Sequence, residues 1–169
     1  TYIAQAQARV SNAQFLYAFY LDGREIRALG PDPSVHVRIL RLSDGYHELR
    51  AVARVKHIVQ FGGSAVRGIM VNRTGRSVSI RQGAIQRLGR FEHGFRIDVE
   101  GPGRPERARL VSGTRVLDEK VYDDDVELVL DEQMLGEGPG RIRAVAVYAD
   151  GMEVSSRPME LGIEFSQNP

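Results

Sequence analysis

The sequence predicts an all-β protein made of two tandem β-sandwich modules. Apolar residues alternate with other residues at a period of two along most of the 169 residues, and no stretch carries a helical stripe. Asp22-Gly23 and Asp44-Gly45 are tight-turn pairs between alternating runs. A second copy of the same pattern follows the first, and this internal repeat sets the number of modules at two.

The alternating runs of the first half predict its strands and their buried faces. The runs cover residues 4–10, 17–21, 35–39, 47–55 and 66–71. Because successive side chains of a strand point to opposite faces, the apolar member of each pair is expected to face the core.

The repeat is read from residues that recur about 93 positions further along the chain. Leu42, Gly45, Leu49 and Ala51-Val52-Ala53 correspond to Leu135, Gly138, Ile142 and Ala144-Val145-Ala146. The second copy has an additional strand at 77–81, followed by a loop in which a short helical turn at 84–88 is one option. We therefore expect residues 1–72 to form a first sandwich that lacks its first strand. Residues 73–169 then form a linker and a second sandwich, and the chain is expected to be a piece of a longer polypeptide.

Composition excludes several classes of partner and chemistry. The chain has 23 basic and 22 acidic residues, so no overall field attracts it to nucleic acid. It has no cysteine, which removes disulfides, thiolate nucleophiles and cysteine metal sites. No run approaches the roughly 18 apolar residues of a membrane helix, so we expect no membrane insertion.

A family resemblance rests on two strings, YAFYLDG at 17–23 and LSDGYHELRAVA at 42–53. Together they resemble the bacterial immunoglobulin-like modules of exported and cell-surface proteins, which carry an aromatic strand ending in Asp-Gly and then a strand with a histidine after a second Asp-Gly. The second copy, LVSGTRV at 110–116 and LGEGPGRIRAVA at 135–146, lacks the aromatic and histidine positions.

The resemblance implies tandem immunoglobulin-like or fibronectin-III-like β-sandwiches at an extracytoplasmic site, which is the periplasm, the cell surface or the secreted fraction. It implies a noncatalytic spacer or protein-interaction module of a larger exported protein. The implied partners are other domains of the same polypeptide or a surface protein. An accessory module that binds carbohydrate or calcium is the alternative.

The histidines His36, His47, His57 and His93 match no metal-ligand spacing. His47 shares a strand face with Leu49, and the resemblance gives it a place in the fold. No serine lies in a Gly-x-Ser-x-Gly elbow, and no glycine loop precedes a helix that could hold a phosphate. We therefore predict no enzyme activity, no catalytic residue and no cofactor.

Two groups of side chains keep the binding alternative open. Asp118, Asp123, Asp124 and Asp125 could supply oxygen ligands to calcium, but they lack the order of a dedicated calcium loop. A solvated loop is the plainer interpretation, and the metal prediction is none. Exposed aromatic rings could stack on a sugar, but alternation turns the rings at 17 and 19 inward and leaves only Tyr20 outward.

Overall fold

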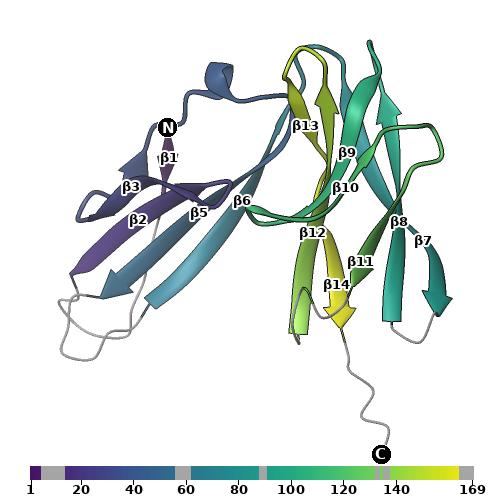
Figure 1. The fold of residues 1–169 in the computed structure, drawn as a ribbon. Coiled ribbons are helices and arrows are strands. Elements are labelled where there is room, and N and C mark those ends of the chain that lie inside the picture. The colour runs from purple at the N-terminus through teal and green to yellow at the C-terminus, as the bar shows by residue number, and fades with distance from the viewer. Residues whose placement is uncertain (5–13, 56–61, 88–90, 132–133, 135–137, 164–169) are drawn as a thin grey trace, which may run out of the picture. The chain divides into compact units, whose positions relative to one another are not determined.

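The computed structural model describes residues 1–4, 14–55, 62–87, 91–131, 134 and 138–163. Strands and short 3-10 turns make up all the regular structure of these residues, which confirms the predicted all-β class (Figure 1). The chain divides into two compact units. Unit 1 is Thr1–Leu42 with His47–Ile69, and unit 2 is Ser43–Tyr46 with Met70–Pro169.

The described residues of the first half of the chain form six strands and a 3-10 turn. They are β1 (Tyr2–Ile3), β2 (Phe15–Leu21), β3 (Arg24–Gly30), β4 (Ser34–Val35), η1 (Ile39–Arg41), β5 (Gly45–Val55) and β6 (Gly62–Val71). Strand β2 pairs antiparallel with β3 on one side and with β5 on the other, and β6 pairs with β5 (Figure 1). Strands β1 and β4 form a separate two-stranded ladder.

The core of unit 1 follows the predicted alternation in part, because Ala51 and Ala53 of the predicted face are only half-buried and Ala18 on the opposite face of β2 is buried. Tyr17 and Phe19 of β2 are buried, and so are Leu49 and Val55 of β5. Tyr17 lies opposite Ala53 and Phe19 lies opposite Ala51, so large rings fill the space above small residues of the neighbouring strand.

The predicted strand at 35–39 is wrong beyond its first residue. Strand β4 ends at Val35, and the backbone then turns into η1, where the Leu42 N–H donates to the Ile39 carbonyl at 3.0 Å. Alternation at Val35, Val37 and Ile39 carries no information about whether a neighbouring strand is present. Ile39 is 47% exposed, because this segment is a connection rather than a strand with a covered face.

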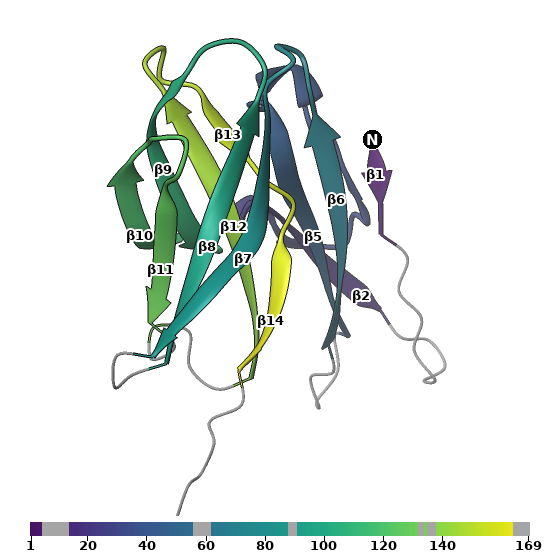
Figure 2. The ribbon, with the colours of Figure 1, turned by 90° about the vertical axis from the view of Figure 1, so that its right-hand side faces the viewer.

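In the second half, the part of the chain that the structure describes forms eight strands. They are β7 (Ser77–Arg87), β8 (Phe91–Glu100), β9 (Pro105–Ser112), β10 (Arg115–Val121), β11 (Glu127–Asp131), β12 (Gly138–Tyr148), β13 (Glu153–Ser155) and β14 (Met159–Ile163). One sheet has the order β10-β9-β12, with β13 and β14 both paired to β12, and the other has the order β11-β8-β7 (Figure 2).

Unit 2 is a β-sandwich, because its core draws side chains from both sheets. Phe95 of β8 and Leu128 of β11 are fully buried against Leu110 of β9 and Ile142 of β12. The predicted core positions Ile142, Ala144 and Ala146 are each 0% exposed, which confirms the assignment of that strand face.

The expectation of a helical turn at 84–88 is wrong for the described residues, which end at 87. Strand β7 continues to Arg87 and pairs with β8 up to Arg87↔Phe91. A bulge between Gln82 and Ile85 shifts the register of the β7–β8 ladder, and pairing with β8 overrides the local preference for a helical turn. In the described part of the chain, no helix has the length and apolar character needed to cross a membrane.

Candidate functional site

Asp44 of unit 2 is a buried carboxylate with several hydrogen-bond partners. Its Oδ2 accepts hydrogen bonds from the Thr74 backbone N–H at 2.7 Å and the Thr74 Oγ1 hydroxyl at 2.5 Å. Its Oδ1 accepts from the Arg73 N–H at 3.0 Å and lies 3.5 Å from Arg73 Nε. Asp44 therefore fixes the segment that runs from the end of β6 towards β7.

The surroundings of Asp44 favour its charged form. Burial by itself raises the pKa of this carboxyl, but the hydrogen bonds from Thr74 and Arg73 outweigh burial and hold the pKa below its usual value. The neighbouring Gly45 has a φ of 104°, and a Cβ there would overlap the backbone of Ser155. Glycine is required at this position because β13 forms a parallel bridge to it, Ser155↔Gly45.

A second carboxylate, in unit 1, joins the strings at 17–23 and 42–53 on which the family resemblance rests. Asp22 adopts a φ of 50°, and its Oδ1 accepts from the Glu48 N–H at 2.8 Å. Its Oδ2 lies 2.7 Å from His47 Nδ1. His47 is only 7% exposed, so this imidazole is held inside the fold by the carboxylate of the Asp22-Gly23 turn.

The other histidines do not converge with His47 in the described residues. His36 Nδ1 lies 2.9 Å from Thr1 Oγ1, beside the β1–β4 ladder. His93 lies on β8 with its ring 6.5 Å from the ring of Phe95. His57 lies outside the described residues.

The acidic residue Asp118, one of the calcium candidates, takes part in backbone hydrogen bonding within unit 2. Its Oδ1 accepts from the Glu119 N–H and its Oδ2 accepts from the Val129 N–H, both at 2.8 Å. The bond from Glu119 stays within β10, whereas the bond from Val129 links β10 to β11, so the carboxylate bridges the two sheets of the sandwich.

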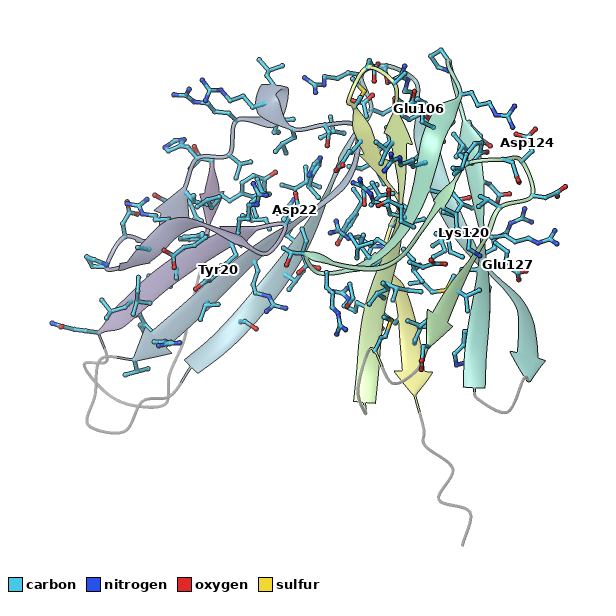
Figure 3. All side chains as sticks on the ribbon, in the orientation of Figure 1. Tyr20, Asp22, Glu106, Lys120, Asp124 and Glu127 are labelled. Atoms are coloured by element: carbon cyan, nitrogen blue, oxygen red, sulfur yellow. The ribbon has the colours of Figure 1, made fainter. Side chains whose placement is uncertain are left out.

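The remaining calcium candidates lie in the loop between β10 and β11 (Figure 3). The Asp123 Oδ1 accepts from the Asp125 N–H at 2.9 Å, and Asp124 lies 3.7 Å from Arg104 with its side chain 85% exposed. Among the described residues, no three His, Asp or Glu side chains gather in a way that could hold a metal ion. Calcium binding at this loop stays an untested alternative to the prediction of no metal site.

The aromatic side chains of β2 divide as alternation predicts. Tyr17 and Phe19 are buried, whereas Tyr20 is half-buried with its hydroxyl 3.4 Å from Glu25 Oε2 (Figure 3). The rings of Phe15 and Tyr17 are tilted by 37° to each other, so this pair does not form a flat platform.

Two polar clusters of unit 2 were missed by sequence reasoning. Arg76 stacks its guanidinium 4.0 Å from the centre of the Tyr148 ring and donates to Asp150 Oδ2 and the Pro102 carbonyl, both at 2.9 Å. The Met152 amide and the Arg76 guanidinium hold the pKa of Asp150 below its usual value. No spacing in the sequence signals these contacts, because Arg76 and Asp150 are far apart in the chain.

The second missed cluster centres on Ser156, which is 1% exposed. Its Oγ accepts from the Ala144 N–H and donates to the Arg157 carbonyl, both at 2.9 Å. The hydroxyl therefore replaces a strand partner for β12 where the chain passes from β13 to β14.

No protein-family model, curated protein or solved structure matches this chain.

Proposed function

We propose that this chain is a noncatalytic spacer or protein-interaction module of a larger exported bacterial protein. The observation that carries the proposal is that the titratable side chains described above make hydrogen bonds within the fold. Asp44 and His47 are buried, Asp22 is partly buried, and all three titratable groups hold turns and strands together. A buried group engaged in this way stabilises the fold and is not presented to a substrate.

The proposal includes two tandem immunoglobulin-like or fibronectin-III-like modules, divided at residues 72 and 73. The strand orders β3-β2-β5-β6 and β10-β9-β12-β14 support it, since each has a hairpin followed by a long strand and a final strand. The antiparallel pairs β1–β4 and β8–β11 are a second similarity between the two halves. The bacterial origin and the extracytoplasmic site rest on the family resemblance of residues 17–23 and 42–53.

Thermal unfolding with and without ligand tests the proposal. We expect the melting temperature of the chain to be the same in calcium, in chelator and in a panel of soluble oligosaccharides, because only a ligand of the folded state raises stability. Asp124→Ala serves as the variant of the acidic loop. A calcium-dependent rise in melting temperature that this variant abolishes would overturn the spacer proposal in favour of a calcium-binding module, and a rise with a sugar would favour a carbohydrate-binding one.

A further inference from the structure

The two outer strands of the β3-β2-β5-β6 sheet differ in how they are protected. Strand β3 carries Arg24, Glu25 and Arg27, and its ladder with β2 shifts register twice. Arg27 also forms an ion pair with Asp32 at 2.6 Å. Charges and irregular pairing are the devices by which edge strands avoid pairing with other chains.

Strand β6 is less protected, because its first seven residues carry a single charged side chain. Residues 62–68 are all exposed, although a strand covered on one face would alternate between buried and exposed positions. Arg67 is the only charge on β6, and its guanidinium lies 5.6 Å from the centre of the Tyr2 ring in β1. Among the described residues, β6 pairs only with β5, so one row of its backbone N–H and C=O groups faces outward.

We propose that this edge pairs with β6 of a second copy of the chain, antiparallel and centred on Ala65. This deepens the proposed function, on which it rests, by naming a partner for the interaction module. A two-fold axis through Ala65 places Arg67 opposite Gly63 of the other copy and Val66 opposite Ser64. Each larger side chain then meets a small one, and the two Arg67 side chains lie at opposite ends of the ladder.

The charge on β6 favours this register over a shifted one. An axis through Arg67 would set two guanidinium groups directly opposite each other, which destabilises an antiparallel pair. The Arg67 side chain of the other copy also has room above Gly63, because a Cβ built there would meet no atom within 4 Å. The pairing therefore combines an open backbone edge with a self-complementary row of side chains.

Single-cysteine crosslinking tests the pairing and its register, and the chain is suited to it because it contains no cysteine of its own. In the proposed ladder, residue 65 of one copy lies directly opposite residue 65 of the other, at about 4.5–5.5 Å between Cβ atoms. We expect Ala65→Cys to form a disulfide-linked dimer under mild oxidation. Gly63→Cys is the matched control, since its two copies would be about 13 Å apart along the strands and should stay monomeric.

Sedimentation of the wild-type chain gives the second measurement. We expect its mass to rise with concentration from 18.8 kDa towards twice that value. Val66→Lys should abolish the rise, whereas Ile26→Lys on β3 should leave it intact, and the two wild-type side chains are matched in exposure at 40% and 41%.

Equal crosslinking of Ala65→Cys and Gly63→Cys, or a wild-type chain that stays monomeric at every concentration, would overturn the pairing. That failure is distinct from failure of the proposed function. If the chain is monomeric and its melting temperature is unaffected by calcium and sugars, the proposed β6 pairing is refuted and the proposed spacer role still stands.

Discussion

Replacing Asp44 with asparagine should destabilise unit 2 far more than a typical surface substitution. The carboxylate is fully buried and accepts three hydrogen bonds, from the Thr74 N–H, the Thr74 hydroxyl and the Arg73 N–H. Hydrogen bonds to a charged acceptor contribute about 1.5–3 kcal/mol each, but they are not additive when they share one group. An asparagine keeps one acceptor oxygen and turns an NH2 group towards buried donors, so we expect a loss of about 3–5 kcal/mol.

The pH dependence of this loss identifies the charge as its cause. The pKa of Asp44 is lowered in the folded state, so its contribution is complete above the unfolded pKa of about 3.9 and disappears as the pH falls through the lower folded-state value. The difference in unfolding free energy between wild type and Asp44→Asn should be constant from neutral pH to about pH 5. It should then shrink below about pH 4.

Urea unfolding followed by far-ultraviolet circular dichroism, repeated across this pH range, measures both effects. Asp124→Asn is the control, because that side chain is 85% exposed and should change stability by less than about 0.5 kcal/mol. The reasoning is refuted if Asp44→Asn costs less than about 1 kcal/mol at neutral pH, or if its cost is the same at pH 3 as at pH 7.

Two further substitutions test the core and the turn. Ile142→Ala removes a side chain that is 0% exposed and should cost about 2–5 kcal/mol in urea unfolding, so a cost near zero would show that the sandwich core repacks freely. Gly45→Ala places a Cβ against the backbone of Ser155 at a φ of 104°, and we expect a loss of at least about 2 kcal/mol. Gly63→Ala, which meets open space, is the control and should be tolerated within about 0.5 kcal/mol; equal melting of the two alanine variants would contradict the argument.

The sequence determined those parts of the fold that depend on local pattern. Period-two alternation placed Tyr17 and Phe19 of β2 and Ile142 and Ala144 of β12 on buried faces, because the geometry of a strand alone fixes which side chains share a side. The Asp-Gly pair at Asp22 marked a turn for a similar reason, since few residues tolerate the backbone conformation that the turn needs.

Local pattern could not say what covers each face. Val37 and Ile39 alternate like a strand but lie in a connection, where no strand of the described residues pairs with them. Val145 points to the opposite face of β12 from the core residues Ala144 and Ala146. It is nevertheless only 8% exposed, so this part of β12 is covered on both faces. Whether a face or an edge is covered depends on segments far away in the chain, and alternation contains no record of them.

The polar contacts that organise the molecule were also decided by tertiary structure alone. Asp44 was recognisable as a turn residue, but its partners Arg73 and Thr74 lie about thirty positions later. Arg76 and Asp150 are further apart still. The residue types at such positions are common on any protein surface. They become a buried, hydrogen-bonded carboxylate or a stacked guanidinium only when folding brings distant segments together. The same step lowers the pKa of Asp44 and of Asp150 through the hydrogen bonds that they accept.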